Sequence, residues 1–126
     1  MREIEFRGQN INGHWAHGNL AIIKEKLDRA EIGAYISNSA GAPFAYQVRP
    51  ETVGQYTGLK DKNGKKIFEG DVGWDEHNEC YGVVKFEEGK FLYVWENIAE
   101  DLQEVADGIE ICGNIHENPE LMEVAE

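Results

Sequence analysis

The sequence predicts a mainly β protein with one amphipathic helix, and three observations lead to this fold class. Short runs alternate apolar and polar residues with the period of two that is typical of half-buried strands. Turn-forming pairs such as Asn12-Gly13 and Asn63-Gly64 separate these runs at short intervals. Apolar residues follow clear helical spacing in only one segment, near residues 97–106.

The N-terminal part, residues 1–50, is expected to be a β-hairpin subdomain. Ile4 and Phe6 alternate with charged residues, and Asn12-Gly13 favours a tight turn because both residues tolerate a positive φ. Residues 24–31 are highly charged and form either a loop or a short helical turn. A turn is expected over residues 38–43, and Pro50 ends this part. The strands predicted here cover residues 2–7, 14–23, 32–36 and 44–49.

The second part, residues 51–126, is expected to be a separate β domain that contains the helix. Asp61 to Gly64 predicts a turn, and Gly70-Asp71 turns the chain into a further strand. Asn118-Pro119 predicts a short final helical turn, because proline suits the first helical position. The other strands predicted here cover residues 53–56, 67–68, 80–86, 90–96 and 109–112.

The helix is predicted near residues 97–106. Asn97 is a suitable N-cap, with Glu100 three residues later, and Gly108 is a suitable stop. The apolar stripe of this helix consists of Ile98, Leu102, Val105 and Ala106.

The predicted hairpin at residues 80–96 has apolar residues on both faces. If Glu87-Glu88-Gly89 is a three-residue loop, Lys85 lies opposite Phe91 and the other pairs follow. One face then carries Phe86, Val84, Leu92 and Val94, and the other carries Phe91, Val83, Tyr93, Tyr81 and Trp95. The aromatic face is covered either by the helix or N-terminal strands of the same chain, or by a partner or second copy. In the second case the predicted anchors are Tyr81, Tyr93 and Trp95.

The net charge of −12 excludes several classes of protein. Residues 1–90 hold all twelve Lys and Arg and fourteen acids, whereas residues 91–126 hold ten acids and no Lys or Arg. Such a chain lacks the broad basic face that duplex DNA binding requires, so nucleic acid is not the expected partner. No apolar run is long enough to span a membrane, and two cysteines do not make a disulfide framework. We therefore expect a cytoplasmic protein.

Neither catalytic residues nor a cofactor or metal site is predicted. His14 and His17 are three residues apart on an expected strand, which directs them to opposite faces. Residues 75–80 are rich in possible ligands but read as a polar turn. Cys80 and Cys112 are expected to be small apolar fillers on neighbouring strands. An enzyme is not expected.

Four lysines surround the turn at residues 60–66. They form either a solvated hairpin tip or a contact for an acidic partner, and they are Lys60, Lys62, Lys65 and Lys66. With the acidic C-terminal segment they would make complementary rims around the aromatic anchors.

Blocks spanning nearly the whole chain resemble the YopX family of phage- and prophage-encoded proteins. The central block is the most specific, and the blocks are Met1–Gly8, Asn12–Gly18, Val53–Val72 and Gly113–Leu121. The resemblance implies an SH3-like small β-barrel in the second half, preceded by a β-rich part, and expression inside a bacterial host. It implies no activity, cofactor or catalytic residue.

The leading functional hypothesis is a non-enzymatic protein that acts through protein–protein contacts and self-association. Head-to-tail contact between the lysine turn and the acidic segment would produce a homo-oligomer. The alternative is an acidic DNA mimic that blocks a host DNA-binding enzyme. A weaker option is a barrel that binds single-stranded nucleic acid through the lysine turn and aromatic side chains.

Overall fold

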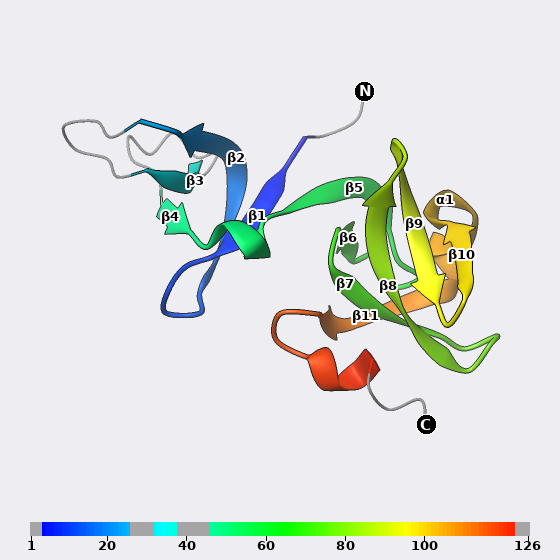
Figure 1. Cartoon of the computed structure of the whole chain (residues 1–126). Coiled ribbons are helices and arrows are strands. Elements are labelled where there is room, and N and C mark those ends of the chain that lie inside the picture. Colours follow the sequence, from blue (N-terminus) through cyan, green and yellow to red (C-terminus); the bar gives the residue numbers. More distant parts are fainter. Residues whose placement is uncertain (1–3, 26–31, 38–45, 123–126) are drawn as a thin grey trace. The chain divides into compact units, whose positions relative to one another are not determined.

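The computed structural model describes residues 4–25, 32–37 and 46–122, and its regular structure is mostly β (Figure 1). The strands are β1 (Phe6–Gln9), β2 (Trp15–Ile23), β3 (Gly33–Ser37), β4 (Tyr46–Val48), β5 (Gly54–Lys60), β6 (Lys66–Phe68), β7 (Asp71–Asp75), β8 (Cys80–Glu87), β9 (Lys90–Trp95), β10 (Ile98–Asp101) and β11 (Ile109–Asn114). The helical segments are α1 (Leu102–Val105) and the 3-10 helices Pro50–Thr52, Ala106–Gly108 and Pro119–Met122. The predicted mainly β class is confirmed. The turn expected over residues 38–43 lies outside the described residues. Residues 26–31 of the charged segment also lie outside them.

The chain divides into two compact units, Met1–Tyr56 and Thr57–Glu126. We refer to them as unit 1 and unit 2. The sequence predicts the boundary between the two parts at residue 50. The boundary falls later because the start of β5 belongs to the sheet of unit 1, where Gly54 pairs with Arg7 and Gln55 with Phe6.

Unit 1 contains an antiparallel sheet in the order β4-β3-β2-β1-β5. The predicted Asn12-Gly13 hairpin is present: Gly13 has a φ of 88°, and the Asn10 N–H donates to the His14 carbonyl at 2.9 Å. The long strand β2 pairs with β1 through its first half and with β3 through its second half. The core of unit 1 is formed by Ala34, Ile36 and Val48, with Phe6, Ala16, Leu20 and Val53 packed against them.

Unit 2 contains an antiparallel sheet in the order β10-β9-β8-β7-β11, and β5 continues into this unit to meet β6. Its core is formed by Ile67, Val84, Phe91, Tyr93, Leu102, Ala106, Ile109 and Ile111. In the part of the chain that the structure describes, the sheets have open edges, so the closed SH3-like barrel is not confirmed.

The β8–β9 hairpin has a different register from the predicted one. Phe86 pairs with Phe91 and Glu87 with Lys90, so the turn contains only Glu88 and Gly89. Both turn residues have positive φ values, 53° and 83°, as a type I′ turn requires. A slip of one residue moves every side chain of one strand to the other face. The two predicted faces are therefore wrong.

The helix predicted near residues 97–106 is also wrong in its first half. Ile98–Asp101 forms strand β10, which pairs with β9 after a two-residue turn. The N-cap is Asp101 rather than Asn97, because the Asp101 carboxylate accepts a hydrogen bond from the Gln103 N–H at 3.0 Å. Leu102 is fully buried, whereas Ile98 is 43% exposed. Only the second half of the apolar stripe therefore reaches the core.

Candidate functional site

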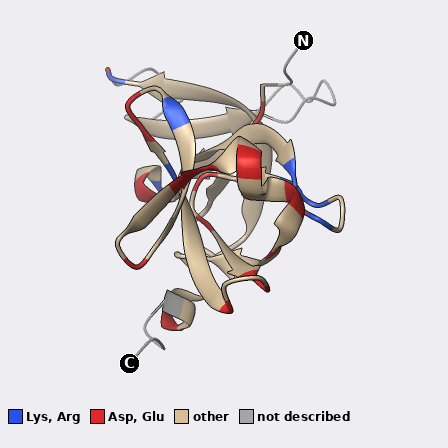
Figure 2. Ribbon diagram, turned by 90° about the vertical axis from the view of Figure 1, so that its right-hand side faces the viewer, with Lys and Arg blue, Asp and Glu red and all other residues tan. Residues whose placement is uncertain are grey.

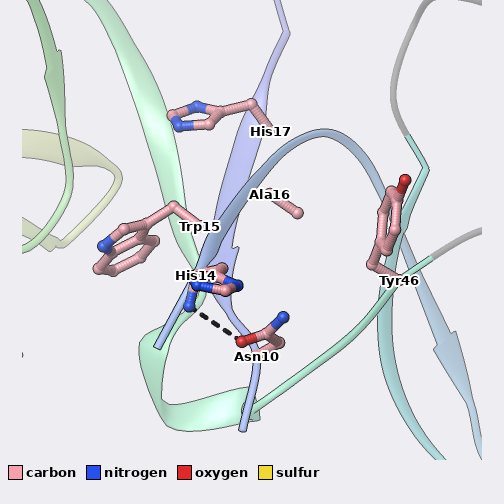
Figure 3. Close-up of a pocket in the computed structure, with 6 residues that line it drawn as sticks. All are labelled: Asn10, His14, Trp15, Ala16, His17 and Tyr46. Atoms are coloured by element: carbon pink, nitrogen blue, oxygen red, sulfur yellow. Dashed lines mark hydrogen bonds between the residues drawn. The ribbon is translucent and has the colours of Figure 1, made fainter. Parts of the chain in front are cut away.

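A pocket of about 350 Å³ lies in unit 1 beside the β1–β2 hairpin (Figure 3). It is lined by Asn10, His14, Trp15, Ala16, His17 and Tyr46. The Asn10 side-chain oxygen accepts hydrogen bonds from the backbone N–H groups of Asn12 and His14, each at 2.9 Å. These bonds fix the hairpin turn and hence the position of His14 at the pocket.

The side chains of Trp15 and His17 are each held by a neighbour in unit 1. The Arg7 guanidinium carbon lies 4.9 Å from the centroid of the Trp15 ring, within cation–π distance. The His17 Nδ1 lies 3.2 Å from a carboxylate oxygen of Glu5. The spacing of His14 and His17 predicts that their side chains lie on opposite faces of the strand. Both histidines line the pocket, but so do Trp15 and Ala16, which are consecutive on β2, so the pocket does not decide whether the histidines share a face.

Sequence reasoning did not find this pocket. Tyr46 comes from β4, and no local pattern links it to the β1–β2 turn. The residues that the structure describes bring no three His, Cys, Asp or Glu side chains together in metal-binding geometry. What the pocket offers chemically is an aromatic wall with imidazole and amide groups.

Tyr93, one of the three predicted anchors, belongs to the core of unit 2. It is fully buried, and its hydroxyl donates a hydrogen bond to the Gly73 carbonyl at 2.8 Å. Burial is the main cause that raises the pKa of Tyr93 above its ordinary value, so the phenol stays neutral. The Tyr93 ring lies directly over Gly82, where an added Cβ would lie 2.5 Å from the ring Cζ. Tyr93 is therefore not a surface anchor.

Tyr81 and Trp95, the other two predicted anchors, are half-buried. The Tyr81 ring meets the Trp74 ring edge-on, with centroids 4.9 Å apart. The Trp95 indole N–H donates to a carboxylate oxygen of Glu100 at 2.7 Å. Tyr81 and Trp95 therefore contact different neighbours within unit 2 and do not form one continuous aromatic face.

The lysine turn is held by the carboxylate of Asp61. One Asp61 oxygen accepts from the Asn63 and Lys65 N–H groups at 2.8 and 2.9 Å, and the other accepts from the Ile111 N–H at 2.9 Å. Lys60, Lys62 and Lys65 are exposed and Lys66 is half-buried. The Lys62 ammonium lies 3.3 Å from a carboxylate oxygen of Glu76, which neutralises part of the turn.

Other polar residues singled out in the sequence have local structural roles. Asp75 accepts hydrogen bonds from the N–H groups of His77 and Asn78 and from the Asn78 amide, which closes the β7–β8 turn as a polar turn. Cys80 lies on β8 and Cys112 on β11, with β7 between them, so the expectation of neighbouring strands is wrong. Cys80 is half-buried and Cys112 is exposed, and burial is the main cause that raises the pKa of each thiol.

The whole net charge of the chain is carried by unit 2, because unit 1 is neutral. Unit 1 has six basic and six acidic residues, whereas unit 2 has six basic and eighteen acidic residues and therefore a net charge of −12. Figure 2 shows the Asp and Glu positions of the chain on several separate turns and strands. Unit 2 thus has a broadly acidic surface.

These features define a class of protein: an acidic, antiparallel β protein of two units with a short helix. The chain belongs to the YopX family, because the family model described as YopX protein matches residues 5–123. The crystal structure of protein EF1440 from Enterococcus faecalis is similar, with a TM-score of 0.60 and 24% sequence identity, covering 97% of this chain and 99% of that one. This likeness concerns the fold. No protein with a curated description matches the sequence.

The helices within the described residues lack the length and apolar character that crossing a lipid bilayer requires.

Proposed function

We propose that this YopX protein is a non-enzymatic binding protein whose acidic unit 2 binds a basic surface of another protein. The observation that carries this proposal is the concentration of the whole net charge, −12, in residues 57–126. A surface of one sign attracts partners of the opposite sign and accelerates their association. The expected setting is the cytoplasm of a bacterium that carries the phage or prophage.

The roles of the polar residues in unit 2 support a binding function rather than catalysis. Asp61, Asp75 and Asp101 accept hydrogen bonds from backbone N–H groups and so stabilise turns or a helix start. The exposed acids remain for contact with a partner.

The basic surface could belong to a second copy of the chain, through the lysine turn at residues 60–66. Two features favour a different protein instead. The Lys62 ammonium already faces Glu76, and two units of charge −12 repel each other. Light scattering at low and at high salt separates the cases. A salt-sensitive oligomer would support self-association, and a monomer at both salt concentrations would support a different partner.

DNA mimicry is the special case in which the bound basic surface is the DNA site of an enzyme. The spread of acids over separate turns favours general charge complementarity over an imitation of regularly spaced phosphates (Figure 2). Competition by duplex DNA for the captured partner would support mimicry. Binding that duplex DNA leaves unchanged would contradict it.

The proposal is tested by capture of proteins from a bacterial lysate with the tagged chain, followed by titration of the captured protein. A double variant, Glu104→Gln with Asp107→Asn, removes two exposed acids of unit 2. The matched control, Glu25→Gln with Glu51→Gln, removes two exposed acids of unit 1.

We expect the unit 2 variant to bind between about twofold and thirtyfold more weakly, since an exposed ion pair contributes about 0.2–1 kcal/mol. The unit 1 control should bind like the wild type. Equal effects of the two double variants, or binding that salt does not weaken, would contradict the proposal.

A further inference from the structure

Strand β10 is an open edge of the sheet in unit 2. It is the last strand in the order β10-β9-β8-β7-β11, and in the described residues no strand pairs with its outer side. In a hairpin with a two-residue turn, such as β9–β10, alternate residues point their backbone groups away from the partner strand. In β10 these residues are Ala99 and Asp101. The backbone N–H and C=O groups of these two residues are therefore available to form hydrogen bonds with another strand.

The edge lacks several of the features that usually protect such strands from pairing, although β10 is only four residues long and carries two acids. Natural proteins protect exposed edges with lysine, proline, bulges or a covering element. The residues of β10 are Ile98, Ala99, Glu100 and Asp101, which include no lysine or proline. Its register with β9 is continuous over four pairs, without a bulge. Ile98 is 43% exposed, and Ala99 is exposed.

The charges around the edge specify what would pair with it. Every charged residue from position 91 to the end of the chain is acidic, so β10 and the segment that follows it offer only carboxylates, and the nearest lysine is Lys90 at the start of β9. Glu96 precedes the strand and Glu104 follows it, and both are exposed. A basic segment gains attraction on this edge, and an acidic one is repelled.

We propose that β10 binds an extended, lysine- or arginine-rich segment of the partner protein, which adds to the sheet as a sixth strand. This inference rests on the proposed function and names its docking element. Ile98 and Glu100 lie on one face of β10, and Ala99 and Asp101 lie on the other. The bound segment therefore carries an apolar residue opposite Ile98 and basic residues opposite Glu100 and Asp101, whose carboxylates also accept hydrogen bonds from the Trp95 indole and the Gln103 N–H.

The inference is tested with a short synthetic peptide that repeats valine, threonine, lysine and lysine. Two further peptides carry N-methyl groups on one or the other set of alternate residues, which removes alternate N–H donors without changing the charge. One N-methylated peptide should bind at least about tenfold more weakly than the parent, because it loses the hydrogen bonds to the edge. The other should bind like the parent, because its methyl groups point away from β10.

Hydrogen exchange locates the binding on the protein. The amide of Ala99 should exchange more slowly when the lysine peptide is bound. Ile98→Lys places a cation on the edge and should weaken binding at least about tenfold. The matched control is Ile115→Lys, since Ile115 has a similar exposure of 39% and is remote from β10 in sequence. This control should weaken binding much less.

Equal binding of the two N-methylated peptides, or an unchanged exchange rate at Ala99, would overturn strand addition while leaving the acidic surface as a binding surface. Loss of the salt-sensitive capture described above would overturn the proposed function instead. A peptide in which glutamate replaces lysine and binds as well as the parent would also overturn the inference.

Discussion

Replacing Asp61 with asparagine should strongly destabilise unit 2. Asp61 is only 6% exposed, and its two oxygens accept three backbone hydrogen bonds, from Asn63, Lys65 and Ile111. In Asp61→Asn one oxygen becomes an NH₂ group, so either the turn or the Ile111 N–H loses its acceptor. A buried N–H without an acceptor costs about 1–3 kcal/mol, and the loss of the charge weakens the remaining bonds. We expect a loss of about 2–4 kcal/mol.

The stabilisation that the Asp61 carboxylate provides should also depend on pH. Burial raises the pKa of Asp61, but hydrogen bonds from Ile111, Lys65 and Asn63 outweigh it and hold the pKa below the ordinary value of 3.8. The folded-state pKa is therefore below the unfolded one. The stabilisation is present above about pH 4 and is lost as the pH falls through the folded-state pKa.

Urea unfolding of the wild type and of Asp61→Asn at about pH 7 and about pH 3 measures both effects. The difference in free energy of unfolding should be smaller at the lower pH. Asp107→Asn is the control, because Asp107 is exposed and should change the stability by less than about 0.5 kcal/mol. An Asp61→Asn protein as stable as the wild type at neutral pH would refute the reasoning. A difference that does not depend on pH would refute the assigned role of the charge.

Three further predictions concern the core and turns of unit 2. Gly82→Ala should destabilise by about 1–3 kcal/mol in urea unfolding, because the added Cβ overlaps the Tyr93 ring. Gly108→Ala, where an added Cβ meets no atom within 4 Å, should not destabilise comparably. Glu88→Asn should raise the free energy of unfolding by up to about 1 kcal/mol, because asparagine tolerates the left-handed φ of 53° better than glutamate; an unchanged midpoint would contradict this. The raised pKa of Tyr93 keeps its phenol protonated above about pH 10, so stability is lost as the pH rises further, and absorbance titration should show one tyrosine that ionises only on unfolding.

Local signals in the sequence were sufficient for most strands and for the first hairpin. In Asn12-Gly13 it is Gly13 that provides the positive φ, 88°, that the first hairpin needs. The β8–β9 register could not be predicted in the same way. Its turn places Glu88 in a left-handed conformation that glutamate rarely adopts, so a three-residue loop with only Gly89 left-handed was the more natural expectation.

The helix and the pocket show where local patterns are insufficient. The spacing of Ile98 and Leu102 suits a helix, but pairing with β9 holds Ile98 in a strand, and the helix starts only after Asp101. Tyr46 meets the β1–β2 hairpin through the strand order of unit 1, which no local pattern reveals. The charge of unit 2 was visible in the sequence, because a boundary at residue 50 instead of after Tyr56 moves only one acid, Glu51, between the two parts.

The most direct test of an acidic binding surface is the affinity of the chain for the lysine peptide at two salt concentrations. Raising the salt from about 50 mM to about 300 mM shortens the screening length and weakens contacts between exposed charges. We predict that the affinity falls by at least about tenfold over this range, and that the glutamate peptide binds at neither concentration. An affinity for the lysine peptide that stays constant between the two salt concentrations would contradict the account.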